Sequence, residues 1–235
     1  TLLMHLFYST SIAEDTIHLD PEESRHLAKV LRLEMGDKVV AIDGSGNQYD
    51  CEVLNAHQKK SVLSILEKTS RQEDFKVSIA AAPTKNLNRW EWFLEKVTEI
   101  GINSIHPIKS YHSERRVLKH DRQERILISA MKQSYKATLP QLSELTPFKK
   151  LIEQDFEQAK YIAHCYDDIP RESLKQVYSK GQKALILIGP EGDFSKEEVE
   201  LAIAKGFQSV SLSESRLRTE TAALVACHTI HLMNA

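Results

Sequence analysis

The sequence predicts an α/β protein in two parts: a small β-barrel over residues 1–72 and a larger α/β domain over residues 73–235. Before residue 70, short segments rich in Val, Ile, Leu and Tyr follow one another closely and are separated by turn residues, as in a small barrel. Beyond residue 74, continuous apolar segments alternate with helical spacing, which predicts a mostly parallel sheet covered on both faces.

The first part contains one predicted helix and three predicted strands. Asp20 is suited to cap a helix that begins at Pro21, with Glu23 as its capping-box partner, and we expect this helix to run to about Leu33. The strands are expected at residues 38–43, 48–54 and 61–67. Residues 71–74 are polar and form the predicted linker.

The second part alternates strands with helices. We expect strands at residues 77–82, 104–108, 161–165, 184–188 and 209–212. Helices are expected at residues 89–100, 121–137, 195–205 and 219–232. Open α/β sheets bind ligands beyond the carboxyl ends of their strands, so the turns after residues 165, 188 and 212 are the candidate site.

Composition and charge narrow the function classes. The three cysteines, Cys51, Cys165 and Cys227, lie far apart, which indicates free thiols rather than disulfides or a metal site. No long apolar run or signal sequence is present, so we expect a cytoplasmic protein. Residues 74–150 carry 14 Lys and Arg against 8 Asp and Glu, a local charge of +6 in a chain whose net charge is −2. That region is either attractive to a polyanion or merely a set of solvated helix faces.

Two segments carry the strongest signals for chemistry. The first is Gly-Pro-Glu-Gly-Asp at residues 189–193, between an apolar strand and a helix that Ser195 is suited to cap. The second is Leu-Arg-Thr-Glu-Thr-Ala at residues 217–222, where Arg216 and Arg218 beside an apolar helix need partners or a ligand. Taken alone, the first segment also fits a tight strand–helix connection without a function, and the second also fits a salt-bridged loop. The phosphate-loop and dinucleotide motifs are absent, which argues against an NTPase or a Rossmann site.

Taken together, these segments resemble the SPOUT class of knotted methyltransferases, and more narrowly the family that methylates N3 of a uridine in 16S ribosomal RNA. That family's N-terminal stretch resembles residues 26–37 and 43–44, and its Lys-x-x-Glu-Leu-Gly signature resembles residues 96–102. The chain departs from the pattern at Asp193 and Ser213, where the family has glycines. It also has Ser215 where the family has an arginine, and Arg216 is adjacent.

The resemblance implies a PUA-like RNA-binding barrel followed by a SPOUT domain with a trefoil knot, which binds S-adenosylmethionine through its loops. The residues it implies for cofactor binding are Ile188, Gly189, Glu191, Gly192, Leu212, Ser213, Leu217 and Thr221. The N3 proton of uridine has to leave, so Arg218 is the candidate to stabilise an anionic ring and Glu220 or Glu191 the candidate base. Both glutamates also suit plain helix capping.

RNA contacts are expected from basic residues in both parts. Arg25, Lys29 and Arg32 have the spacing of one helix face, and Tyr135 could stack on a base. Further candidates in the basic middle region are Lys85, Arg89 and Arg115. Trp90 and Trp92 are two apart on a helix, so at most one faces the core; we expect the other to be covered by core or dimer packing rather than RNA.

Two alternatives stay open at this stage. A related enzyme could methylate a ribose 2′-oxygen or another base, and a non-catalytic RNA-binding module could retain the barrel with a decayed cofactor pocket. For the substrate we expect 16S rRNA or the small ribosomal subunit. Residues 222–232 are apolar nearly all round, which predicts a homodimer built on the C-terminal helix.

Overall fold

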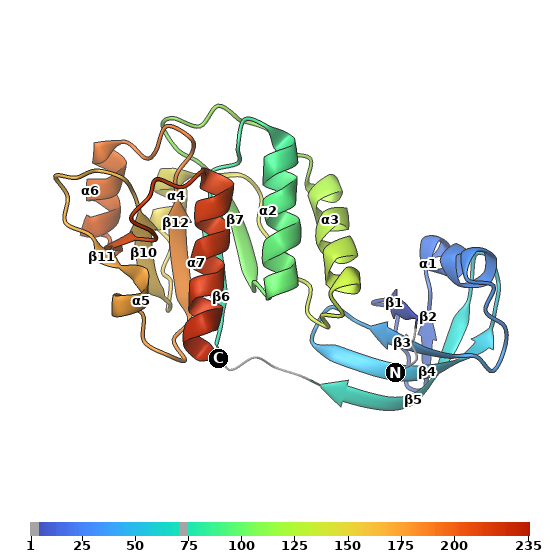
Figure 1. The fold of residues 1–235 in the computed structure, drawn as a ribbon. Coiled ribbons are helices and arrows are strands. Elements are labelled where there is room, and N and C mark those ends of the chain that lie inside the picture. The colour runs from blue at the N-terminus through green and yellow to red at the C-terminus, as the bar shows by residue number, and fades with distance from the viewer. Residues whose placement is uncertain (1–4, 71–74) are drawn as a thin grey trace. The chain divides into compact units, whose positions relative to one another are not determined.

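The computed structural model describes residues 5–70 and 75–235, so the predicted linker at residues 71–74 lies outside the described residues. The chain divides into two compact units (Figure 1). The first comprises Thr1–Gln72 with Met131–Leu139, and the second comprises Glu73–Ala130 with Pro140–Ala235. Residues 131–139, which the sequence assigns to the second part, thus belong with the first unit.

The first unit is built on a five-stranded sheet in the order β1-β3-β4-β5-β2. β3 and β4 pair antiparallel, as do β4 with β5 and β5 with β2, and β1 joins β3 in parallel. Its core contains Phe7, Ile17, Leu27 and Val53, all buried. The three predicted strands are present; two further strands of three residues each were too short to predict. The strands are β1 Leu6–Tyr8, β2 Thr16–His18, β3 Lys38–Ile42, β4 Asn47–Asn55 and β5 Val62–Ser70.

The helix of the first unit is shorter than the sequence predicts. It starts as expected, with Asp20 accepting a hydrogen bond from the Glu23 N–H and Pro21 in the first turn, but α1 ends at Arg25 (Pro21–Arg25). It continues as a π-helical turn, η1, over His26–Val30. Arg32 then has a φ of 55°, outside any right-handed helix. The helical segment therefore ends at Val30, before the predicted end near Leu33, and its second half has the i→i+5 hydrogen bonds of a π-helix rather than those of an α-helix.

Residues 131–139 pack on the first unit through specific contacts. The Leu139 N–H donates to the Gly44 carbonyl at 2.8 Å, and the Gly46 N–H donates to the Ala137 carbonyl at 3.0 Å. Lys132 forms an ion pair with the buried Glu23 of α1. Burial raises the pKa of Glu23, and Lys132 opposes that rise.

The second unit is built on a parallel sheet in the order β11-β13-β10-β12-β6-β7-β8, with β9 pairing to β7. Every strand pair described in it is parallel, which confirms the predicted sheet type. Its strands are β6 Val77–Ala81, β7 Ser104–Lys109, β8 Gln141–Leu142, β9 Thr146–Pro147, β10 Ala159–Ala163, β11 Glu172–Ser173, β12 Ala184–Ile188 and β13 Gln208–Ser211. Its helices are α2 Leu87–Ile100, α3 His120–Gln133, α4 Phe148–Ile152, α5 Leu174–Val177, α6 Lys196–Ala204 and α7 Thr219–Asn234. The end of α3, from Met131 on, is assigned to the first unit.

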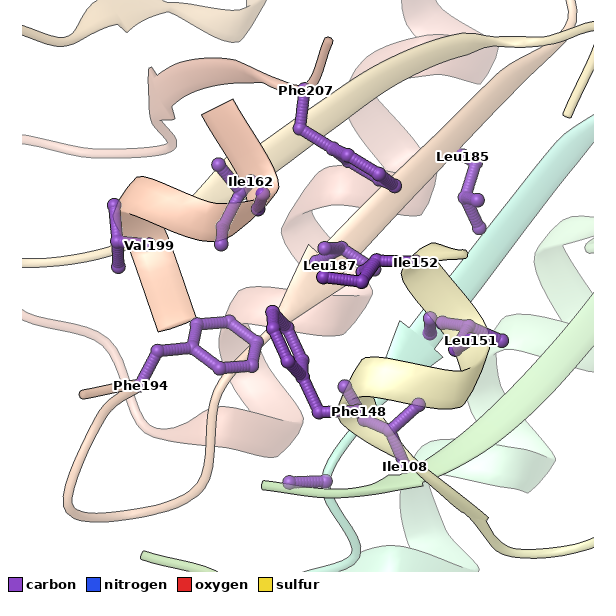
Figure 2. Close-up of a cluster of buried hydrophobic side chains, with 13 residues drawn as sticks. Ile108, Phe148, Leu151, Ile152, Ile162, Leu185, Leu187, Phe194, Val199 and Phe207 are labelled. Atoms are coloured by element: carbon purple, nitrogen blue, oxygen red, sulfur yellow. The ribbon is translucent and has the colours of Figure 1, made fainter. Parts of the chain in front are cut away.

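Helices cover both faces of this sheet, as predicted (Figure 1). On one face, α2 and α7 pack together, and α7 lies against β6 and β12. On the other face, Phe148 of α4 and Val199 of α6 pack with Leu185 and Leu187 of β12 (Figure 2). Successive strand residues point to opposite faces, so both sides of β12 are apolar and the strand is buried throughout.

Other sequence predictions for this unit have mixed outcomes. Trp90 is 1% exposed and Trp92 is 41% exposed, which confirms that only one of them faces the core. The helix expected to reach residue 137 ends at Gln133, and Tyr135 has a φ of 53°. The three cysteines are free. Among the described helices, none combines the length and apolar character that crossing a bilayer requires. The trefoil knot stays a prediction.

Candidate functional site

The candidate site lies at the carboxyl edge of the parallel sheet. β12 pairs with β10 on one side and β6 on the other, and β13 pairs with β10. Because these strands run in the same direction, the loops that follow them emerge at one edge. These loops span residues 82–86 after β6, 164–171 after β10, 189–195 after β12 and 212–218 after β13. They include most of the predicted cofactor residues.

Gly189 follows β12 at a point where a side chain does not fit. A Cβ atom there would lie 3.0 Å from the Phe194 backbone nitrogen and 3.2 Å from the Asp193 carbonyl carbon. The Gly189 carbonyl accepts a hydrogen bond of 3.0 Å from the Thr219 hydroxyl. The turn after β12 is thereby fixed to the first residue of α7, which joins the two sequence motifs.

Asp193 stabilises the same turn and explains one departure from the family pattern. Its φ of 64° is left-handed, a conformation that glycine adopts freely, so a family glycine at this position is understandable. The Asp193 carboxylate compensates: Oδ1 accepts from the Phe194 N–H at 2.8 Å, and Oδ2 accepts from the Cys165 N–H at 2.8 Å. The second bond links the loops after β10 and β12.

The loop after β10 contributes two residues that the sequence did not single out as functional. His164 is buried and its Nε2 lies 3.2 Å from the Ser209 hydroxyl. Burial lowers the pKa of His164, and the nearby Arg171 lowers it further. Cys165 is exposed as a residue, but partial burial of its thiol and the nearby Asp193 carboxylate raise the pKa of Cys165. The sequence placed both residues inside the strand expected at residues 161–165, whereas β10 ends at Ala163 and leaves them in the loop.

The contacts of Glu191 favour a structural role over a catalytic one. Its Oε1 accepts a hydrogen bond of 2.9 Å from the Lys85 N–H, which ties the loop after β12 to the loop after β6. Arg115 donates to the Thr84 carbonyl at 3.1 Å and to the Lys85 carbonyl at 2.6 Å. The Lys85 ammonium pairs with Glu114 at 2.8 Å. Two predicted RNA-binding residues, Lys85 and Arg115, therefore have partners within the protein.

The loop after β13 carries the second departure. Ser213 is exposed, and its hydroxyl accepts a hydrogen bond of 3.2 Å from the Ser215 N–H, a local turn that needs no glycine. Leu212 and Leu217 are half-buried and apolar. Arg216 is exposed and acts electrostatically on Cys165, lowering the thiol pKa against the larger effect of burial.

A pocket of about 360 Å³ lies where the start of α7 meets α2. It brings together both predicted catalytic residues, Arg218 and Glu220, with the predicted cofactor residue Thr221 and the predicted RNA residue Arg89. Asn88 and Trp92 complete its lining, and the sequence had assigned neither to a site. The Arg89 Nε lies 3.7 Å from Glu220 Oε1.

Glu220 is unusual within this pocket because its carboxyl group is buried but incompletely paired. Its side chain is 9% exposed, and Oε2 has no hydrogen-bond partner among the residues that the structure describes. Buried polar atoms are nearly always hydrogen-bonded in proteins, so an unpaired one at a pocket wall points to a ligand donor. Helix capping, the plain alternative, leaves this oxygen unexplained.

The predicted site residues thus fall into three groups. Around the carboxyl edge of the sheet lie Ile188, Gly189, Glu191, Gly192, Leu212, Ser213 and Leu217. The pocket contains Arg89, Arg218, Glu220 and Thr221. Arg25, Lys29 and Arg32 belong to the first unit and are all exposed. The described residues contain no cluster of three or more His, Cys, Asp or Glu side chains able to bind a metal ion.

A parallel α/β domain with a candidate site in the loops at its carboxyl edge, joined to a small five-stranded β unit, is the architecture that the sequence resemblance implied for an RNA methyltransferase. Residues 71–231 match the family described as RNA methyltransferase domain, and residues 19–67 match the RNA methyltransferase PUA domain. The chain belongs to this family of RNA methyltransferases.

Individual relatives are similar to this chain over nearly its whole length. The ribosomal RNA small subunit methyltransferase E of Bacillus subtilis is 28% identical over 232 residues, which cover 92% of this chain and 89% of the relative. A probable rRNA methyltransferase from Porphyromonas gingivalis is 43% identical, with a TM-score of 0.91 and 98% of each chain covered. The fold is shared with the ribosomal RNA small subunit methyltransferase E of Neisseria gonorrhoeae bound to S-adenosyl methionine, which is 24% identical with a TM-score of 0.87 over 98% of each chain.

Proposed function

We propose that this protein transfers a methyl group from S-adenosylmethionine to N3 of a uridine in 16S ribosomal RNA. The observation that carries the proposal is the buried, incompletely paired Glu220 carboxylate beside Arg218 in the pocket of an RNA methyltransferase. The relatives named as small-subunit rRNA methyltransferases support the choice of RNA. A ribose 2′-hydroxyl, the alternative acceptor, needs no group that reads a ring N–H.

The loops at the carboxyl edge suit S-adenosylmethionine chemically. Leu212 and Leu217 offer half-buried apolar surface to an adenine ring, and the Gly189 turn presents main chain without a side chain in the way. The residues proposed to bind the cofactor are Ile188, Gly189, Glu191, Gly192, Leu212, Ser213, Leu217 and Thr221. When bound, the cofactor supplies an electrophilic methyl group.

Residues of this protein are proposed to deprotonate the uracil ring at N3 and to stabilise the resulting charge. Neutral N3 has no free lone pair, so its proton must be removed as the ring reacts. Glu220 is the proposed acceptor, because its Oε2 is unpaired, whereas Glu191 is engaged by the Lys85 N–H. Arg218, exposed at the same pocket, is proposed to stabilise the negative charge that develops on the ring oxygens.

RNA contacts are proposed at both units. Arg25, Lys29 and Arg32 are exposed and form no ion pair with any residue in the described parts of the chain, so their charges are free to meet phosphates. Arg89 lies at the pocket, where it is 40% exposed and forms only a long ion pair of 3.7 Å with Glu220. Lys85 and Arg115 are weaker candidates because they are already engaged within the protein. Because the substrate is ribosomal RNA, we propose that the protein works in the cytoplasm.

A homodimer built on α7 is part of the proposal. α2, α5, β6 and β12 cover one side of this helix. Leu224 and Val225 are only half-buried and Leu232 is 66% exposed, so an apolar strip stays uncovered. A second copy of the same helix is suited to cover it, and two-fold dimers are the commonest oligomer.

The proposed reaction is tested on 16S rRNA from a strain that lacks the protein. The RNA, free or in small subunits, is incubated with purified protein and S-adenosylmethionine, and nucleosides are identified by mass spectrometry. We expect N3-methyluridine and a new stop in primer extension, since N3 methylation blocks base pairing. A 2′-O-methylated nucleoside would instead support the related enzyme, and no product without cofactor binding would support the non-catalytic module.

The cofactor site is tested separately with Gly189→Val. We expect the affinity for S-adenosylmethionine to fall by at least ~10-fold, or about 1.4 kcal/mol, because a branched side chain cannot fit beside the Phe194 nitrogen without moving the turn. Isothermal titration calorimetry measures this, and rRNA binding should be unchanged as a control. Unchanged cofactor affinity would contradict the location of the site.

A further inference from the structure

The pocket at the start of α7 has features that cofactor binding does not explain. Trp92 is a large aromatic side chain left 41% exposed at its wall. Asn88 and Trp92 lie four residues apart on α2 and so share one helix face. The start of α7 contributes Arg218, Glu220 and Thr221 to the lining of the same pocket.

The chemistry of this lining is specific. A buried carboxylate oxygen without a donor requires an N–H or O–H from whatever enters the pocket. An exposed indole offers a flat apolar surface on which a planar ring can stack. The Asn88 amide and the Arg218 guanidinium are donors suited to ring carbonyl oxygens.

Uracil meets all of these requirements, and cytosine does not. Uracil has an N3–H donor between two carbonyl oxygens, so one ring edge offers a donor flanked by two acceptors. In cytosine, N3 is an acceptor, which would face the Glu220 carboxylate and repel it. Enzymes that modify a base in RNA or DNA turn that base out of the stack into such a pocket and read its pairing edge there.

We infer that this pocket receives the flipped-out target uracil. Trp92 stacks on the ring, Glu220 accepts a hydrogen bond from the N3–H group, and Asn88 donates a hydrogen bond to a ring oxygen. The inference rests on the proposed function and deepens it, because it assigns Trp92 and Asn88 as the residues that select and position the base. It departs from the expectation that core or dimer packing covers the second tryptophan.

The test compares Trp92→Leu with Trp92→Phe in steady-state methylation of unmodified 16S rRNA. Loss of a base–aromatic stack costs about 5- to 150-fold in affinity, so we expect the KM for RNA to rise by that range in Trp92→Leu. Trp92→Phe should retain most of the wild-type value, and the KM for S-adenosylmethionine should not change in either variant. Ile203→Ala is the matched control, because Ile203 of α6 is also 41% exposed but does not line the pocket.

Two binding readouts complete the test. In a Trp90→Phe background, Trp92 is the remaining tryptophan, and its fluorescence should be quenched when rRNA and S-adenosylhomocysteine are added together. Light scattering of Trp92→Leu should give the same mass as the wild type. A changed mass would overturn the inference in favour of a second copy as the occupant, and an unchanged KM for RNA would overturn it outright. Absence of methylation by the wild type would instead reject the proposed function.

Discussion

Asp193 shows how one residue can adopt a conformation that its type disfavours. The left-handed backbone is held by two hydrogen bonds to its carboxylate, one from the next residue and one from Cys165. The sequence showed that Asp193 departs from the family pattern but not how the turn is stabilised. Neither a φ value nor a hydrogen bond between residues 28 positions apart can be inferred from one sequence. The same is true of Glu220, whose unpaired oxygen is recognised only from its burial in the folded chain.

Substitution of Asp193 separates the contribution of its carboxylate hydrogen bonds from the strain of its left-handed backbone. Asp193→Gly loses the hydrogen bonds but relieves the backbone, whereas Asp193→Ala loses the bonds and retains the strain. We expect Asp193→Ala to be the less stable variant by about 1 kcal/mol, or about 2–4 °C in Tm for a domain of this size. Differential scanning calorimetry measures the difference. Equal melting temperatures would mean that the turn relaxes away from the left-handed conformation.

At the scale of elements, the sequence predicts what its periodicity encodes. β12 was predicted at residues 184–188, as observed, because a continuous apolar strand is buried on both faces. β8, β9 and β11 were missed because two residues carry no period. The α-to-π change after Arg25 was missed as well, since it depends on packing rather than on a sequence pattern. The capped starts of α1 and α6 were predicted because side-chain caps are local.

The basic segment after Asp20 gives a prediction of its own. Arg25→Ala, Lys29→Ala and Arg32→Ala together should weaken rRNA binding and reduce the dependence of log K on log salt by up to about 2 to 3, since each lost phosphate contact lowers the slope by about 0.7 to 0.9. Filter binding at several salt concentrations measures this, with cofactor affinity as the control. An unchanged slope would mean that these side chains are only solvated.

A histidine in the parallel sheet leads us to expect that the stability of the folded protein depends on pH. His106 of β7 is half-buried between the Ser104 and Ser143 hydroxyls, at 3.0 and 2.9 Å, and burial lowers the pKa of His106. The unfolded chain then binds more protons than the folded one. The stabilisation is present above the ordinary histidine pKa of 6.5 and is lost as pH falls below it towards the folded pKa.

His106→Gln should therefore make unfolding less sensitive to acid. Between pH 7 and pH 5, we expect the Tm of the wild type to fall more steeply than that of the variant, although the variant is less stable at pH 7. Buried His164 and partly buried His26, whose pKa values burial also lowers, leave the variant with some remaining acid sensitivity. Parallel Tm curves for the two proteins would contradict a contribution from His106.

At the scale of the whole molecule, the dimer is the main expectation. Val225→Glu adds a charge to the apolar strip on α7, and burying an unpaired charge in an interface costs about 3–5 kcal/mol. We expect the variant to be monomeric at micromolar concentration and its methylation activity to fall. Light scattering and the nucleoside assay measure both. A wild-type protein that is active as a monomer would refute the dimer.

The contribution of residues 131–139 to the first unit has a consequence for modularity. A chain that leaves a unit, forms much of a second one and then returns cannot be divided by a single cut. A gene fragment encoding residues 1–72 would lack the partners of Gly44, Gly46 and Glu23, so the PUA-type unit is not a portable cassette. Recombination could not exchange it as one continuous piece, and the two units are expected to be inherited together.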